Sequence, residues 1–370
     1  MRDYNLLHHI GIETNGEKIW YIAEMIGCVI EVDIATGKSA CICDIPGFTD
    51  EGSYRNLKYF NGKLYILPFK TDEMFIYDID NSTMDKVILP DKNLHYVGAL
   101  IDEGKMYLYG DSSFITVYGL AKNTTEMLEL DPIKLGIGFT PSEWFWTSSL
   151  LCEHDKFFAM NGDNGMVKLD ADDNISYIQM GESHHKWKSQ NSVMVNMDFK
   201  VLYINENNEV TSSTYEKDGR LKHQACIDFD TKWEVYPYVY AALSDMGWIS
   251  FPFLTNGLEL IDENEGVTKR YYDLDISEAD INKDNGYLFG CGNKYSNDVI
   301  YAIDQMFGHL VIVDVSSNSI EKKELVFDED GIKSIKDAFK HRLSEDNGII
   351  QEKKTFADLN WFINDVLKEG

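Results

Sequence analysis

The chain has no long apolar run and no recognisable export signal. No stretch approaches the ~18 consecutive apolar residues that cross a bilayer, so no transmembrane helix is expected. Residues 1–5 carry no cationic segment followed by an apolar run, so no secretory peptide is predicted. We therefore expect a cytoplasmic protein.

Cysteine is scarce and irregularly spaced. The six cysteines fall within predicted strands, as buried reduced thiols would. Cys41 and Cys43 are two residues apart on one strand, so they are expected on the same face, where two thiols would suit a metal ion. Core packing is the preferred interpretation, and no metal site is predicted.

Positive charge is also in short supply. Lys and Arg number 34 against 62 Asp and Glu, which gives a formal net charge of -28. Such a chain repels nucleic acid and anionic membrane surfaces, so neither is expected as a partner. The acidic residues are interpreted as a solubilising surface, with a basic partner as the alternative.

Motifs that carry a definite chemistry are missing. The adjacent His184 and His185 have no Glu at metalloprotease spacing, and no Gly-x-Ser-x-Gly elbow occurs. The stretch from Asp170 begins like a calcium loop, but Ile175 stands where such a loop needs glycine, and a turn is predicted instead. No cofactor is expected.

The chain does contain one repeated phrase, a strand of the type Lys-Leu-Tyr-Ile. Successive copies are 42 to 53 residues apart, and several are followed by a second apolar strand that closes on Asp, as at Asp33 and Asp78. The seven copies are anchored at Tyr21, Tyr65, Tyr107, Phe158, Tyr203, Trp248 and Tyr301.

Each copy contains four predicted strands, which is the signature of a β-propeller blade. We predict an all-β fold, a seven-bladed β-propeller of four-stranded antiparallel blades over residues 1–328, with a pair of β-sandwiches as the alternative. Residues 329–370 change to helical periodicity and are predicted to form a short helical extension packed on the propeller. Alternatively, this extension docks a partner through Trp361 and Phe362.

Two segments resemble parts of a kelch repeat. Residues 33–38, Asp-Ile-Ala-Thr-Gly-Lys, look like its strand-turn-strand part, and residues 61–66, Asn-Gly-Lys-Leu-Tyr-Ile, look like the preceding strand. The glycine doublet of kelch repeats is missing. The resemblance implies a kelch-like or generic seven-bladed propeller and assigns no functional residue.

The first strand of each blade is expected to line the central channel, so residues at one level form a ring near its mouth. When the first strands are aligned on the repeated phrase, polar side chains fall at this level. His9 and Arg55 fall together at the next level. Such a ring suits a polar ligand, but a water-filled channel without a ligand is the preferred interpretation. The level contains His8, Tyr54, Tyr96, Thr147, Asn191 and Tyr238.

Arg55 is one of few arginines. A guanidinium at the channel mouth can clamp a carboxylate or phosphate, although an internal Asp or Glu partner is the preferred interpretation.

The loops that enter blades four, five and six concentrate tryptophan and histidine. Indole rings beside polar groups suit a sugar ring or an extended peptide, and packing between blades is the equal alternative. The candidates are Trp144, Trp146, His184, His185, Trp187 and Trp233.

Two function classes follow. The first is a non-catalytic binding or scaffold propeller that recognises a polypeptide or glycan through the channel-mouth loops. The second is a lyase, hydrolase or epimerase acting on a sugar or peptide, with a histidine as acid or base. The enzyme requires at least two of the candidate histidines to approach Arg55 or a carboxylate. These are His8, His9, His95, His184 and His185.

Overall fold

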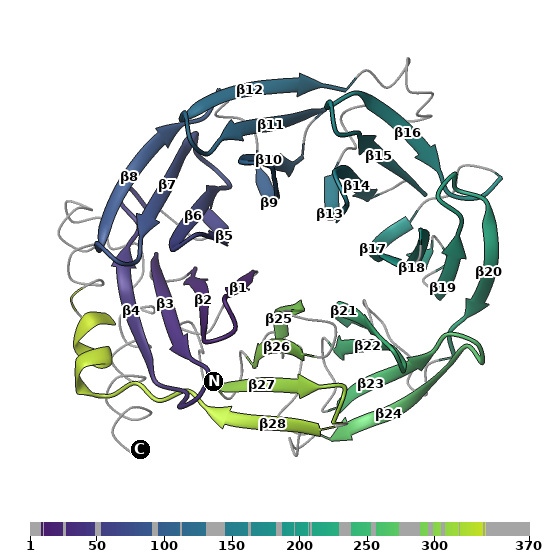
Figure 1. Ribbon diagram of the computed structural model, residues 1–370. Coiled ribbons are helices and arrows are strands. Elements are labelled where there is room, and N and C mark those ends of the chain that lie inside the picture. The colour runs from purple at the N-terminus through teal and green to yellow at the C-terminus, as the bar shows by residue number, and fades with distance from the viewer. Residues whose placement is uncertain are drawn as a thin grey trace.

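The seven-bladed propeller is confirmed. The computed structural model describes residues 9, 11–24, 27–48, 53–90, 95–111, 113–130, 145–161, 164–182, 187–195, 197–205, 207, 209–228, 238–252, 257–273, 289–294, 299–304, 308–317, 319–335 and 337. Within these, seven four-stranded antiparallel sheets form a ring (Figure 1). No helix among the described residues is long and apolar enough to cross a membrane.

Each blade is built from one continuous stretch of chain, with its strands paired in sequence order from the channel outward. Blades 1 to 3 comprise β1 (Ile12–Thr14), β2 (Lys18–Ala23), β3 (Cys28–Asp33) and β4 (Ser39–Asp44); β5 (Tyr54–Phe60), β6 (Lys63–Pro68), β7 (Glu73–Asp78) and β8 (Thr83–Ile88); and β9 (Tyr96–Asp102), β10 (Lys105–Gly110), β11 (Phe114–Gly119) and β12 (Thr124–Glu129). Blades 4 and 5 comprise β13 (Phe145–Cys152), β14 (Asp155–Asn161), β15 (Gly165–Leu169) and β16 (Ile175–Gln179); and β17 (Trp187–Val195), β18 (Asp198–Asn205), β19 (Val210–Tyr215) and β20 (Leu221–Cys226). Blades 6 and 7 comprise β21 (Tyr238–Ser244), β22 (Gly247–Pro252), β23 (Gly257–Asp262) and β24 (Val267–Asp273); and β25 (Phe289–Lys294), β26 (Val299–Asp304), β27 (His309–Asp314) and β28 (Ser319–Glu324).

The recurring aspartate at the end of the third strand makes the turn to the fourth. In blade 1 the Asp33 carboxylate accepts a hydrogen bond from Thr36 N at 2.9 Å, and in blade 2 Asp78 accepts one from Asn81 N at 3.0 Å. Asp170 likewise accepts from Asp172 N and Asn174 N, each at 2.9 Å. These side chains act as local turn acceptors. The stretch after Asp170 is therefore a turn, as predicted.

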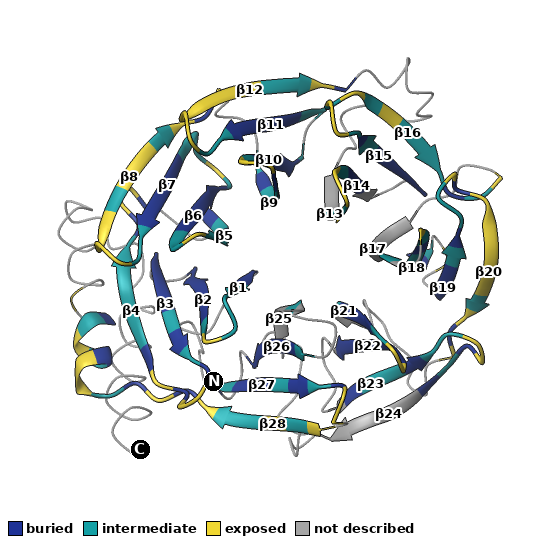
Figure 2. Ribbon diagram, in the orientation of Figure 1, coloured by how far each residue is buried: buried dark blue, intermediate teal, exposed yellow. Residues whose placement is uncertain are grey.

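The core lies between the blades. Successive residues of a strand point to opposite faces, so the second strand of each blade serves both neighbours. Trp20 and Ile22 pack against blade 2, whereas Ile19 and Tyr21 pack against blade 7. Within the described residues every pair of adjacent blades shares one such hydrophobic cluster, and the outermost strands β8, β12 and β20 are largely exposed (Figure 2).

The prediction that Cys41 and Cys43 share a face is wrong. Val29 pairs with Cys43 and Ile30 with Cys41, which leaves Ile42 as an extra residue in a β-bulge. The bulge reverses the alternation. Cys41 packs against the cluster between blades 7 and 1, and Cys43 against the cluster between blades 1 and 2.

The ring closes through the segment after β28. Among the described residues, blades 1 and 7 exchange no strand. Instead, Val326 forms a parallel bridge with Lys38, and its carbonyl accepts a hydrogen bond from Ser39 N at 2.8 Å. The Lys38 ammonium lies 2.6 Å from the Asp328 carboxylate.

A short helix over residues 329–335 follows and packs on the outer side of blade 1 (Figure 1). Ile335 is fully buried in the cluster shared by blades 7 and 1, and the Ser334 hydroxyl accepts a hydrogen bond from Cys41 N at 3.1 Å. The second predicted helix, with Trp361 and Phe362, lies outside the described residues.

Replacing Ile335→Ala should lower the free energy of unfolding by about 2–4 kcal/mol, because it empties a buried site at the closing seam. Urea unfolding followed by tryptophan fluorescence measures the change. The exposed Lys333→Ala on the same helix is the control and should shift the midpoint little. Equal midpoints for both variants would contradict a role of the helix in closure.

Candidate functional site

The inner strands carry an aromatic residue at one shared level. In each of blades 2 to 7, the last residue of the second strand pairs with an aromatic residue of the inner strand. These residues are Tyr54, Tyr96, Phe145, Trp187, Tyr238 and Phe289, paired with Pro68, Gly110, Asn161, Asn205, Pro252 and Asp304.

This register corrects the predicted ring in two blades. Phe145 occupies the level in place of Thr147, and Trp187 occupies it in place of Asn191, which pairs deeper in the sheet with Leu202. The cause is a longer first hairpin in both blades, since the anchor residue pairs further back along the chain than in blade 2. Lys58 pairs with Tyr65 in blade 2, whereas Ser149 pairs with Phe158 and Gln190 with Tyr203. Trp187 is thus a strand residue rather than part of a polar loop.

Tyr54 and Tyr96 are packing residues. Each is 1% exposed; Tyr54 lies against Phe48 and Phe75, and the Tyr96 hydroxyl is 2.7 Å from the Thr116 hydroxyl. Burial raises the pKa of the Tyr54 hydroxyl well above its usual value, and the nearby Glu73 carboxylate adds to the shift. Neither ring offers a surface to a ligand in the channel.

His9 is also buried, with its ring 5.1 Å from that of Tyr21. For Trp146 and Tyr238 the structure describes the backbone pairing, with Met160 and Pro252. The other candidates lie outside the described residues; they are His8, Trp144, His184, His185 and Trp233.

What the structure does bring together is a column of four side chains, which we call the blade 2–3 stack. It consists of Arg55, Phe69, His95 and Asp111. The Arg55 guanidinium carbon lies 4.1 Å from the centre of the Phe69 ring, and the Phe69 and His95 rings stack at 4.9 Å with an interplanar angle of 22°. His95 Nδ1 contacts the Asp111 carboxylate.

Local backbone contacts position the stack at the end of the ring where the inner strands begin. Ser53 O accepts a hydrogen bond from Phe69 N at 2.8 Å, which holds the exit of β6 beside the entry of β5. In blade 3, His95 O accepts one from Asp111 N at 3.2 Å. A β-carbon at Gly110 would lie 1.7 Å from His95 O, so this close approach requires glycine.

The Asp111 carboxylate fixes the orientation of His95. Besides the ring contact, Asp111 accepts a hydrogen bond from His95 N at 2.9 Å. An ionised carboxylate can only accept, so Nδ1 carries a proton, and in the neutral imidazole Nε2 is then the acceptor. This is the arrangement of a base oriented by a third group.

Arg55 has no acidic partner among the described residues, so the preferred interpretation of an internal ion pair stays a prediction. The guanidinium Nε is buried and makes no hydrogen bond. Sequence reasoning found Arg55 and His95 but missed Phe69 and Asp111. Both directly follow a second strand, and only the pairing between blades shows that they meet.

The enzyme hypothesis requires at least two histidines beside Arg55 or a carboxylate, and the described residues provide one, His95. Of the five candidates, only His9 and His95 belong to the described residues; His95 contacts a carboxylate, and His9 packs on Tyr21. Among the described candidate histidines, none besides His95 therefore lies beside the stack as a second acid or base.

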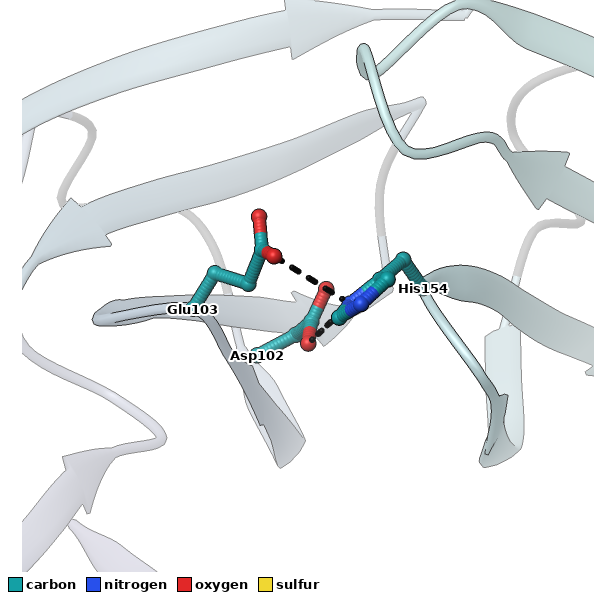
Figure 3. A group of neighbouring side chains, drawn as sticks. All are labelled: Asp102, Glu103 and His154. Carbon is teal, nitrogen blue, oxygen red and sulfur yellow. Dashed lines mark hydrogen bonds and ion pairs between the residues drawn. The ribbon is translucent and has the colours of Figure 1, made fainter.

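A separate cluster lies at the opposite end of blades 3 and 4, where the inner strands finish (Figure 3). His154 Nδ1 is 3.3 Å from an Asp102 carboxylate oxygen and 3.4 Å from a Glu103 oxygen, close enough for a shared metal ion. However, the buried Lys156 ammonium lies 3.5 Å from Asp102 and already supplies the positive charge. We interpret the group as an ion-pair network.

An open pocket of about 350 Å³ lies at the same end of the inner strands. Its wall is formed by residues near the ends of three inner strands, and it is polar and apolar in nearly equal parts. The lining residues are Lys58, Tyr59, Phe60, Ala99, Leu100, Ile101, Ser149, Leu150 and Leu151. The Lys58 ammonium is paired with Glu13 at 2.7 Å, so the pocket offers few unsatisfied polar groups.

The comparisons with known proteins establish the fold. No protein-family model matches the chain, and no curated protein matches it. Among solved structures, virginiamycin B lyase from Staphylococcus aureus is similar with a TM-score of 0.61 and 11% identity, over 83% of this chain and 95% of the lyase. The β-propeller domain of Cps50 (Swd1) from Myceliophteria thermophila gives 0.58 and 11%, over 83% and 97%. Hsv2 from Kluyveromyces lactis gives 0.54 and 7%, over 85% and 98%.

These identities show a shared fold and nothing finer. The chain is a seven-bladed β-propeller, and the kelch resemblance holds at the level of the fold only.

The pH dependence of stability should reveal the buried charges between blades 3 and 4. Burial opposes ionisation of Asp173, but hydrogen bonds from Lys105, Tyr107 and Lys156 outweigh it and hold the pKa of this carboxyl below its usual value. A lowered folded pKa adds stability above the unfolded pKa of ~3.9, and this is lost as pH falls through the folded value. Asp173→Asn should therefore cost roughly 1–3 kcal/mol at pH 7 and less at pH 3.

Urea unfolding at both pH values measures this difference. The exposed neighbour Asp172→Asn is the control and should leave the profile unchanged. A deficit in Asp173→Asn that is the same at pH 7 and pH 3 would show that the carboxylate charge is not the cause.

Proposed function

We propose that this protein is a non-catalytic binding propeller that recognises a polypeptide or glycan at the end of the ring where the inner strands begin. The observation that carries the proposal is the blade 2–3 stack. It presents a guanidinium, an aromatic ring and an imidazole in one column, and all three are partly accessible. Such a column combines the accessible parts of two rings with hydrogen-bond donors, which suits peptide and sugar ligands alike.

The charge of the molecule supports the same choice of partner. With a net charge of -28, the surface disfavours nucleic acid and anionic membranes. The cytoplasmic location stays a prediction.

The binding proposal is tested with peptide and glycan arrays, followed by titration calorimetry of the hits. Phe69→Ala should weaken a hit at least tenfold, about 1.4 kcal/mol, because it removes the central ring of the stack. His223→Ala, in the exposed outer strand β20, is the control and should bind normally. Unchanged affinity in Phe69→Ala for every hit would place recognition elsewhere.

The second candidate is an enzyme, and the oriented His95–Asp111 pair is the observation that favours it. One of the similar solved structures is a catalytically inactive variant of the S. aureus virginiamycin B lyase with quinupristin, with a TM-score of 0.55, so a propeller of this layout is compatible with catalysis. The contact between His95 and a carboxylate supplies one base, whereas acid–base turnover of a sugar or peptide usually needs a partner acid as well.

Incubation of array hits with the protein, followed by mass spectrometry, separates the two candidates. Turnover that falls 10²–10⁴-fold in both His95→Gln and Asp111→Asn would establish the enzyme. We expect the hits to be recovered unchanged. Phe69→Ala serves as a comparison, since it should weaken binding without removing the base.

A further inference from the structure

Arg55 occupies a special place in blade 2. It is the extra residue of a β-bulge, because Tyr54 pairs with Pro68 while Asn56 pairs with Leu67. A bulge redirects the side chain it adds. Here it carries the guanidinium over the ring of Phe69, which in turn stacks on His95 just before β9.

The guanidinium lacks the partner that other cations of this chain have. Arg220, although exposed, contacts both Glu216 and Asp218, and the buried Lys156 contacts Asp102 and Asp173. Arg55 makes no ion pair or side-chain hydrogen bond within the described residues, and its Nε is shielded from water. A buried N–H without an acceptor is costly, and the part of the chain that the structure describes supplies none for this group.

The Phe69 ring lies against the guanidinium, and the Arg55 side chain as a whole is partly accessible. A guanidinium contacts an aromatic ring through its face, whereas its N–H donors lie in its own plane and remain free to bind an acceptor. Two parallel N–H groups on a fixed plane match the two oxygens of a carboxylate. A neutral carbonyl would fill one donor and leave the charge uncompensated.

The surroundings favour an acceptor with a single negative charge. One guanidinium balances one charge, the neighbouring Asp111 carboxylate is engaged with His95, and the chain as a whole carries -28. A doubly charged phosphate would meet more repulsion than one arginine offsets.

We infer that Arg55 is the recognition residue for a carboxylate on the ligand, held edge-on by the guanidinium while Phe69 and His95 contact the adjoining part of the ligand. This inference rests on the proposed function and names the chemical group that is read at the same site. An acidic peptide side chain and a uronic acid both supply this group, and the experiment separates them.

The experiment follows the Arg55 Nε–H signal by ¹H–¹⁵N NMR in the full chain. The probes are N-acetylglutamate with its neutral match N-acetylglutamine, glucuronate with its neutral match glucose, and inorganic phosphate. We expect one carboxylate probe to shift the signal in a saturable manner, its neutral match to leave it in place, and phosphate to bind at least tenfold more weakly. The probe that binds identifies the peptide or the glycan source.

Arg55→Met should abolish saturable binding, and Arg55→Lys should weaken it at least tenfold, because an ammonium lacks the planar fork. Arg220→Met is the matched control and should bind as the wild type does. Thermal unfolding of each variant verifies the fold, and Arg55→Lys keeps the charge should the methionine variant be unstable.

The inference is overturned if no carboxylate shifts the Arg55 signal, if the neutral matches bind equally well, or if Arg55→Met retains affinity. An array ligand that depends on Phe69 but not on Arg55 would overturn this inference and leave the binding function intact. Carboxylate binding at Arg55 without any array ligand would support this inference and overturn the proposed recognition of a polypeptide or glycan.

Discussion

The structure depends on the need of every blade to cover both of its faces. A four-stranded sheet with apolar residues on both sides is unstable alone, and each blade buries its faces only against two neighbours. The second strand of blade 1 shows this directly, since Ile19 and Tyr21 pack against blade 7 while Trp20 and Ile22 pack against blade 2. The seam between blades 7 and 1 is therefore as necessary as any other, although the chain does not cross it with a shared strand. Val326, Asp328 and Ile335 hold it instead.

The same packing rule explains why the blade 2–3 stack can exist. The ladders of blades 2 and 3 set the positions of Phe69 and His95 separately, and the hydrophobic cluster between the blades sets their separation. Asn56 adds a hydrogen bond from its side-chain amide to Val97 O in the neighbouring inner strand. The site is thus held by the most regular part of the molecule rather than by a loop alone.

The fold was readable from the sequence because its signals are local. The repeated second strand and the aspartate turns recur within each blade, and both depend on residues close together in the chain. The channel level was wrong at Thr147 and Asn191 because the first hairpin is longer in blades 4 and 5 than in blade 2. The shared face of Cys41 and Cys43 was wrong because one added residue in a ladder reverses the alternation. For the site, Arg55 and His95 were found by residue type. Phe69 and Asp111 were missed since their meeting is fixed by contacts between blades.

The construction of each blade from one continuous stretch has a consequence for how the chain folds. Sheets can form one after another as the chain is synthesised, each from contacts close in sequence, which is fast. The last step joins groups very far apart, such as Asn293 and Ile12, whose contact spans 281 residues. Until then blade 1 presents an uncovered apolar flank. A nascent or slowly closing molecule is therefore most exposed to aggregation through its earliest-made part.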